Sequence, residues 1–162
     1  MRILGIDPGL RLTGFGCLEP APRSGRSDAK VIDAGVLRLD ADAPVADRLV
    51  ELDRDFRELL DRLKPDVLAI EMLYSHYKHP ATAIVMGHGR GVIILAAKQR
   101  SVTLVELRPT EIKKSLTGHG HATKAQMQDS IAVALALEVR PEPPDVADAL
   151  AMALCVLRRG IC

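Results

Sequence analysis

Four carboxylates stand at the ends of apolar segments that lie far apart in the chain. Asp7 follows the apolar residues 3–6, Glu71 follows the apolar residues 67–70, and Asp145 and Asp148 open a helix-forming stretch. Burying a carboxylate is costly, and neighbouring like charges make its ionisation harder still. Such a group persists mainly where a hard divalent cation neutralises it. If the fold brings the four side chains together, the sequence predicts a metal site.

Each acid also has a purely structural explanation. Asp7 could start the turn at Pro8-Gly9, and Glu71 could be an exposed strand end. Asp145 could be the N-cap of a helix, with Asp148 as an acid in its first turn. Against this last reading, positions i and i+3 share one helix face, which continues in apolar residues suited to packing on a sheet. We therefore expect both acids to point inward.

The apolar periodicity predicts an α/β fold with a mixed five-stranded sheet flanked by helices on both faces. The predicted strands are residues 2–6, 13–18, 30–39, 67–70 and 102–106; the predicted helices are 45–63, 81–98, 110–116, 123–138 and 145–158. The first three strands should be antiparallel. Residues 67–70 are continuously apolar, which is typical of an interior strand in parallel pairing. Ligands of such sheets gather at the carboxyl ends of strands, where Asp7 and Glu71 stand.

Length and composition predict a single domain over residues 1–162. The chain has 162 residues, of which 48% are hydrophobic, enough for one full core. It contains neither an apolar run long enough for a membrane span nor a signal-peptide pattern, so we expect no membrane association and a cytoplasmic protein. The three scattered cysteines are expected to be reduced thiols.

The formal net charge of +1 conceals an uneven distribution of charge along the chain. Residues 72–126 hold eight Lys and Arg residues against two acids, a net charge of +6, and all five histidines. This segment could be a solvated face, or it could be a surface that binds a polyanion beside the acidic pocket.

An ordered set of motifs resembles the RuvC-type Holliday junction resolvases, which have the ribonuclease H-like fold. The matching pieces are Gly5-Ile6-Asp7-Pro8-Gly9, Thr13-Gly14-Phe15-Gly16, Ala69-Ile70-Glu71, Gly89-Arg90-Gly91, Lys113, Lys124 and Asp145-x-x-Asp148-Ala149-Leu150-Ala151. They span nearly the whole chain in the family's order. The resemblance implies a homodimeric endonuclease that resolves four-way DNA junctions by paired symmetric nicks in recombination and repair. It also implies a branch-migration motor as a partner.

The resemblance further assigns roles to individual residues. Asp7, Glu71, Asp145 and Asp148 would hold two Mg²⁺ or Mn²⁺ ions per active site, with Asp7 bridging them in two-metal-ion hydrolysis. Lys124 would either stabilise charge on the phosphate in catalysis or simply contact the DNA backbone. The remaining residues expected to bind DNA are Lys113, Lys114, Lys78, Arg90 and Tyr74.

Tyr74 takes the place of a family aromatic, often phenylalanine, that engages junction bases. It stands in a polar loop beside the His-rich residues 76–79, one of only four aromatic residues in the chain. An exposed aromatic beside cationic residues can stack on an unpaired base, although it could also merely cover the core.

Helix 81–98 is apolar on nearly every side, which predicts a contact with a second copy of the chain. Gly87, Gly89 and Gly91 would allow two backbones to approach closely in that contact.

Three other functions fit parts of the sequence. A sugar-kinase or actin-like ATPase has a similar glycine-bearing hairpin, but it needs two such domains. A ribonuclease that processes ribosomal RNA precursors shares the fold, although the acid pair near residue 145 and the basic middle segment favour the junction enzyme. A non-catalytic junction-binding module would not need four intact acids.

Overall fold

The computed structural model describes residues 1–22, 27, 29–73, 80–118, 120 and 122–160. These residues form a mixed five-stranded sheet with the strand order β3-β2-β1-β4-β5. The strands are β1 (Ile3–Asp7), β2 (Leu12–Pro20), β3 (Ala29–Arg38), β4 (Val67–Glu71) and β5 (Thr103–Leu107). Strands β1 to β3 are antiparallel neighbours, whereas β4 runs parallel to both β1 and β5. The predicted sheet and its pairing are confirmed.

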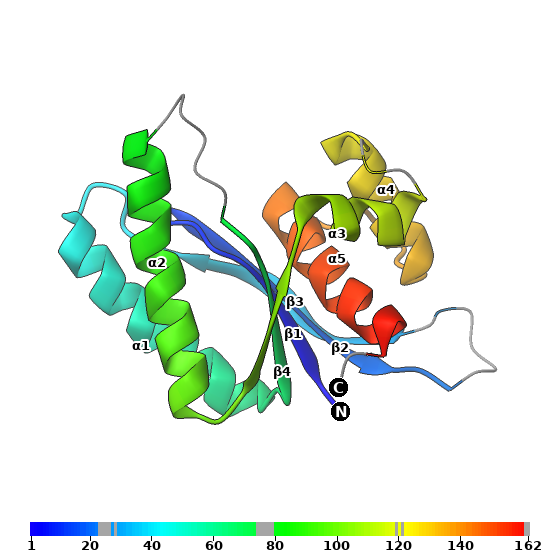
Figure 1. Ribbon diagram of the computed structural model, residues 1–162, viewed down its shortest axis with the longest axis horizontal. Helices are drawn as coiled ribbons and strands as arrows, with labels where there is room; N and C mark the ends of the chain where they lie inside the picture. Colours follow the sequence, from blue (N-terminus) through cyan, green and yellow to red (C-terminus); the bar gives the residue numbers. More distant parts are fainter. Residues whose placement is uncertain (23–26, 28, 74–79, 119, 121, 161–162) are drawn as a thin grey trace.

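Helices cover both faces of the sheet (Figure 1). One face carries α1 (Val45–Leu63) and α2 (Pro80–Gln99), and the other carries α3 (Pro109–Thr117), α4 (Lys124–Ala134) and α5 (Pro144–Arg159). The alternation of side chains along β1 and β4 divides the core accordingly. Ile3, Val67 and Ala69 belong to the cluster beneath α5, whereas Leu4 and Ile6 belong to the cluster beneath α1 and α2.

Helix α5 lies unusually close to the strands beneath it. A Cβ atom added to Gly5 of β1 would stand 1.9 Å from the backbone oxygen of Ala149. A Cβ atom added to Gly14 of β2 would stand 2.2 Å from the backbone oxygen of Asp145. Because these obstacles are backbone atoms, no side-chain rotation could relieve either clash. The two glycines therefore set the distance between α5 and the sheet.

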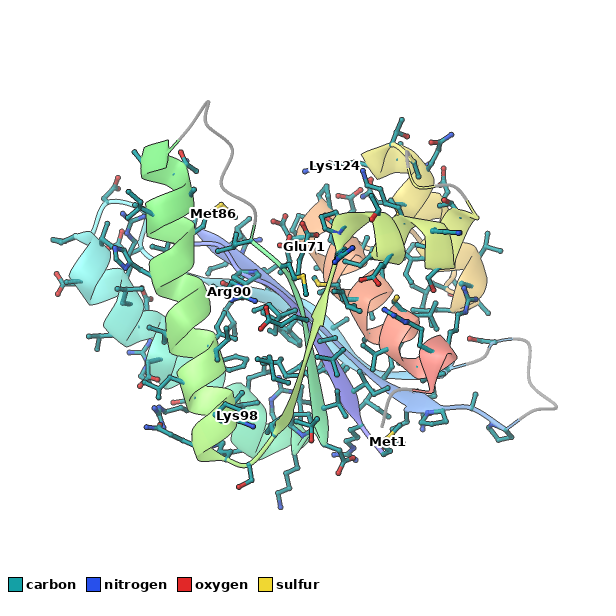
Figure 2. All side chains as sticks on the ribbon, in the orientation of Figure 1. Met1, Glu71, Met86, Arg90, Lys98 and Lys124 are labelled. Carbon is teal, nitrogen blue, oxygen red and sulfur yellow. The ribbon has the colours of Figure 1, made fainter. Side chains whose placement is uncertain are left out.

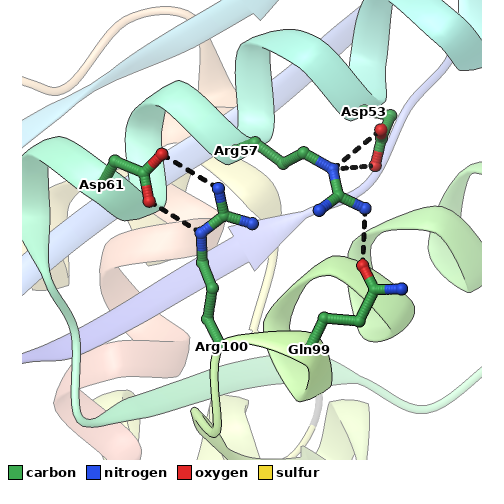
Figure 3. A network of polar contacts seen from close by, with 5 residues as sticks. All are labelled: Asp53, Arg57, Asp61, Gln99 and Arg100. Atoms are coloured by element: carbon green, nitrogen blue, oxygen red, sulfur yellow. Dashed lines mark hydrogen bonds and ion pairs between the residues drawn. The ribbon is translucent and has the colours of Figure 1, made fainter.

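A polar network joins α1 to the C-terminal end of α2 (Figure 3). Arg100 donates two hydrogen bonds to the Asp61 carboxylate, at 2.7 and 2.9 Å. Arg57 donates to Asp53 within α1 and to Gln99 of α2. Arg100, one of the basic residues of segment 72–126, thus braces two helices.

Two details of the helices differ from the sequence prediction. Helix α4 ends at Ala134 rather than at residue 138, because Ala136 adopts a left-handed conformation with φ of 51°. The amides of Ala136 and Leu137 donate to the carbonyls of Val133 and Ala132, a Schellman ending. Helix α5 has Pro143 as its N-cap and Pro144 as its first residue, so Asp145 is not the N-cap that the structural alternative required.

Two further expectations concern cysteines and membranes. Cys17 and Cys155 are buried free thiols, as predicted. Within the described ranges, no helix combines the length and the apolar character that a membrane crossing requires.

The close approach of α5 predicts that Gly5→Ala will be strongly destabilising. The added methyl group must push α5 away from β1, and overpacking of this kind costs about 1–3 kcal/mol or more. Urea unfolding measures the loss. The control is Gly35→Ala in β3, where the added Cβ would meet only the Phe15 ring, at 3.2 Å. Equal stability losses in the two variants would show that the α5 contact sets no such limit.

Candidate metal and DNA site

Asp7 and Glu71 lie side by side at the carboxyl ends of two parallel strands. Ile6 of β1 is in register with Ile70 of β4, so the residue after each ends its strand at the same edge. Alternation places Asp7 on the same face as Ile3 and Gly5. By the same alternation Glu71 shares a face with Val67 and Ala69, and this is the face that α5 covers.

Helix α5 brings the other two acids to this edge. Gly14 pairs with Asp7 across the β1–β2 hairpin, and the space above Gly14 is filled by the backbone of Asp145. Asp148 follows one turn later, on the side of α5 that continues in the buried Ala149 and Met152. Asp7, Glu71, Asp145 and Asp148 are all partly buried. The predicted meeting of four carboxylates at one sheet edge is therefore what the fold produces.

The acids disfavour one another's ionisation. Burial raises the pKa of Asp7 to about 7, and the charges of Asp148, Asp145 and Glu71 add to this effect, whereas Lys124 opposes it. Burial, followed by Asp148, also raises the pKa of Glu71, and Lys113 opposes that shift. The pKa of Asp148 is raised by burial and by Asp145, against the lowering effects of Lys124 and Lys113. Asp7 stands at the centre of this group, because the other three acids all act on it.

One cavity of about 390 Å³ contains most of the predicted site. Its walls include the carboxylate residues Asp7, Glu71 and Asp148, and the two cations Lys113 and Lys124. Figure 2 shows Glu71 at the strand ends, with Met86 on α2 and Lys124 near the start of α4 on opposite sides of it. Asp145 does not line this cavity; it lines a neighbouring cleft of about 560 Å³.

The donor set suits a hard divalent cation that keeps part of its hydration shell. No group of three or more His, Cys, Asp or Glu side chains among the described residues is gathered tightly enough to hold one ion. Mg²⁺ does not need such a cage, since it is usually bound by one or two carboxylates together with water and substrate phosphates. Burial and the neighbouring acids raise the pKa of Asp7, and Lys124 compensates its negative charge only in part. Asp7 and the three carboxylates around it therefore fit ions shared with a phosphate substrate.

Arg90 is placed differently from the other predicted DNA-binding residues. Its side chain is 15% exposed, and its Nη2 pairs with the Glu106 carboxylate of β5 at 2.5 Å. Its Nε donates to the backbone oxygen of Glu71 at 3.2 Å. Figure 2 shows this side chain reaching from α2 toward the sheet. Arg90 thus ties α2 to the ends of β4 and β5 and supports the strand end that carries Glu71.

The other basic residues that the structure describes in segment 72–126 lie in different parts of the fold. Lys113 and Lys124 border the acid cavity, and Lys114 is exposed on α3 outside its lining. Lys98 lies near the opposite end of α2 from Met86 (Figure 2), and Arg100 is paired with Asp61. The charge excess therefore includes a few residues at the site, while Arg90 and Arg100 pair with acids elsewhere in the fold. Tyr74 and Lys78 lie outside the described residues, as do residues 76–79, and their roles stay predictions.

Two residues have roles at the site that the sequence did not predict. Gly14 makes room for Asp145, and Met86 lines both the acid cavity and the neighbouring cleft. The glycines of β1 and β2 carried a usable signal, because Gly14 and Gly16 alternate on one face of a strand. Met86 carried none, since a methionine in an apolar helix is ordinary core composition.

The fold and the site define a class of nuclease. The structure resembles that of RuvC from Thermus thermophilus, with a TM-score of 0.86 and 29% identity over 99% of this chain and 97% of that one. It also resembles T. thermophilus RuvC in complex with a Holliday junction substrate, with a TM-score of 0.84, 29% identity, and coverage of 96% and 92%. The yeast mitochondrial Holliday junction resolvase Ydc2 shares the fold at 15% identity and a TM-score of 0.67. The ribonuclease H-like architecture of the resolvases is thereby confirmed.

Sequence comparison identifies the family. The family model for the crossover junction endodeoxyribonuclease RuvC matches residues 3–156. Proteins of that name from Synechococcus sp. (strain WH7803) and Caldicellulosiruptor saccharolyticus are 41% and 43% identical to this chain. The two matches cover 95% and 96% of this chain, and 96% and 91% of those proteins. The chain belongs to the RuvC family of crossover junction endodeoxyribonucleases, as its motifs predicted.

The raised pKa of Asp7 predicts how the metal-free protein responds to pH. The folded state holds the Asp7 proton more tightly than the unfolded chain, whose carboxyl has its ordinary value of 3.8. Stability from this group is therefore present below pH 3.8 and is lost as the pH rises to about 7. We expect Asp7→Asn to be more stable than the wild type at pH 8 in EDTA, by ~1–3 kcal/mol, and equally stable near pH 4.

Thermal unfolding at the two pH values measures this difference. The control is Asp129→Asn, an exposed carboxylate of α4 that pairs with Arg140. A wild type that is as stable as Asp7→Asn at pH 8 without metal would contradict the electrostatic strain described above.

Proposed function

We propose that this chain is a divalent-metal-dependent endonuclease that resolves four-way DNA junctions by paired symmetric nicks in recombination and repair. The observation that carries the proposal is the cavity in which Asp7, Glu71 and Asp148 face Lys113 and Lys124, in a chain of the RuvC family. The complex of the related T. thermophilus RuvC with a Holliday junction supports four-way DNA as the substrate. Family membership also separates this chain from the ribosomal RNA processing enzymes.

The residues divide the chemistry among them. We assign Asp7 to a position shared by two Mg²⁺ or Mn²⁺ ions, because the other three acids surround it. Glu71 would help to hold one ion, and Asp145 or Asp148 would help to hold the other. The bound ions supply activation of the attacking water and neutralisation of charge on the phosphate.

The protein's own groups orient the strand. Lys113 and Lys124 border the cavity on the α3 and α4 side, where their ammonium groups can contact phosphate oxygens. Arg90 supports the end of β4 by donating a hydrogen bond to the backbone oxygen of Glu71. The hydrolysis leaves a 5′-phosphate and a 3′-hydroxyl at each nick.

The test of this function is cleavage of a synthetic four-way junction with Mg²⁺ or Mn²⁺, read on a denaturing gel. We expect paired, symmetric nicks from the wild type and none from Asp7→Asn, Glu71→Gln or Asp148→Asn. Junction binding by these variants should stay within a few-fold of the wild type, because affinity comes mainly from contacts with the phosphate backbone.

The control variant is again Asp129→Asn, which should cut as the wild type does. If the wild type binds junctions but does not cut them with divalent ions, the protein is a non-catalytic binding module and the proposal is wrong. Cleavage of structured RNA but not of junctions would favour the ribonuclease alternative.

We also propose a two-fold symmetric homodimer formed through α2. The inner side of this helix is buried at Ile93, Ala96 and Ala97, whereas Ile84 and Leu95 are 60% and 56% exposed on the outer side. A Cβ added to Gly91 would meet no atom within 4 Å, which leaves room for a partner. Gly89 does not share this role, because its Cβ would face Leu10 at 3.0 Å. Symmetric cutting needs two sites related by a two-fold axis.

The double substitution Ile84→Lys with Leu95→Lys tests the dimer. It puts two like charges on the proposed contact, so we expect a monomer by sedimentation velocity at micromolar concentration and the loss of paired nicking. Val50→Lys is the matched control, because Val50 is 71% exposed on α1. A wild-type monomer with full resolvase activity would contradict the proposal.

The resemblance implies two further properties that stay predictions: a branch-migration motor as a partner and a cytoplasmic location.

A further inference from the structure

A second cleft adjoins the acid cavity on the side of α1 and α2. It has a volume of about 560 Å³ and is lined by the β1–β2 turn at residues 9–12, by Arg48 of α1, by the first turns of α2 and by Asp145. This volume lies within the range of sites that bind small organic groups. Met86 lines both this cleft and the acid cavity. The cleft is therefore a lateral extension of the candidate active site.

Arg48 brings a cation with unused hydrogen-bonding capacity to this cleft. One Nη1 bond, 3.0 Å long, goes to the backbone oxygen of Leu10 and anchors the turn that follows Asp7. The Nε of Arg48 is buried and has no hydrogen-bond partner. Among the described residues, every other buried side-chain nitrogen or oxygen has a partner. A guanidinium has five donors, and leaving a buried donor unpaired is costly. Because Arg48 also lines the cleft, an acceptor bound there can take up donors that the guanidinium does not use within the protein.

The remaining walls indicate what kind of acceptor fits. Arg11 is exposed on the turn and gives the cleft a second positive charge. Leu12, Val85 and Met86 supply apolar surface between the two arginines and α2. Two cations beside apolar walls match a nucleotide, whose phosphate is anionic and whose sugar and base have apolar faces.

We propose that this cleft is a DNA subsite that holds the nucleotide next to the scissile phosphate. Its phosphate binds Arg11 and Arg48, and its sugar and base lie against Val85 and Met86. We choose DNA as the occupant because the cleft is continuous with the acid site. The cleft reaches Asp145, whose backbone packs over Gly14, and Gly14 pairs with Asp7 across the hairpin. A DNA strand that runs from the acid cavity across Met86 would pass directly into this cleft. The inference rests on the proposed function, because the occupant is the strand being cut.

Arg48 alone could be explained as a support for the turn, through its bond to Leu10. That explanation gives Arg11 no role, and it does not account for the open volume of the cleft. A test must therefore separate loss of a DNA contact from loss of the turn, and it should use Arg11 and the cleft walls in addition to Arg48.

The first experiment measures junction binding against salt concentration with Mg²⁺ present, in the non-cleaving Asp7→Asn background. Arg11→Ala and Arg48→Lys should each weaken binding about 5- to 10-fold, and Arg11→Ala should reduce the salt slope by about 1. Thr82→Trp, which fills the cleft without a change of charge, should weaken binding with an unchanged melting temperature. Arg54→Ala is the control: it removes the same charge from α1 at an exposed residue that pairs with Asp55. It should have no such effect.

The second experiment locates the contact on the DNA. Two junction substrates each carry one neutral methylphosphonate, either at the phosphate just 5′ or at the phosphate just 3′ of the cutting site. One of the two substrates should lack the negative charge that Arg11 binds. On one of these two substrates the penalty of Arg11→Ala should vanish, and it should persist when the methylphosphonate lies in a distant arm.

The outcomes separate this inference from the proposed function. Equal binding by wild type, Arg11→Ala and Thr82→Trp, with normal cleavage in the otherwise wild-type protein, overturns the subsite alone. A penalty that persists on both flanking substrates overturns it as well. Absence of cleavage by the wild type, with intact binding differences, overturns the proposed function instead.

Discussion

The site depends on how closely α5 packs against the first two strands. At Gly5 and Gly14 the helix backbone takes up the space where a side chain would stand, 1.9 and 2.2 Å from the ideal Cβ positions. Because Gly14 pairs with Asp7, the contact that seats the helix also sets Asp145 beside the end of β1. Larger side chains in place of Gly5 and Gly14 would hold α5 further from the sheet. Asp7 and Glu71 would then end their strands without Asp145 and Asp148 beside them. The geometry of the fold and that of the site therefore have one origin.

This packing has an electrostatic cost that function explains. Burial and three neighbouring acids raise the pKa of Asp7 to about 7, so the protein alone stabilises its charge poorly. Lys113 and Lys124 offset only part of the repulsion. A cluster that is unfavourable by itself becomes favourable when divalent ions and a phosphate share it. Strain of this kind, retained at a functional site, is what separates Asp7, Glu71 and Asp148 from ordinary strand-end and turn residues.

Sequence reasoning succeeded where periodicity and the order of motifs carried the information. The continuous apolar run of residues 67–70 correctly indicated an interior parallel strand, and strand-end positions correctly predicted that Asp7 and Glu71 meet. It did not find the exact helix ends, nor contacts between segments that are distant in sequence. The left-handed Ala136 ends α4 early, and Pro144 rather than Asp145 begins α5. The pairing of Arg90 with Glu106 is a contact that no local pattern reveals, and the expected role of Arg90 in DNA binding stays a prediction. The basic segment looked continuous in sequence, but the fold disperses it.

The central claim is that four acids from β1, β4 and α5 form one centre for two divalent ions, with Asp7 between them. Electron paramagnetic resonance of Mn²⁺ titrated into the junction complex tests it most directly, with non-hydrolysable linkages at the cutting sites. We expect two ions per chain with a spin-coupled spectrum, and loss of the coupling in Asp7→Asn with retained junction binding. Uncoupled Mn²⁺ in the wild type, or the same coupled spectrum from Asp7→Asn, would contradict the claim.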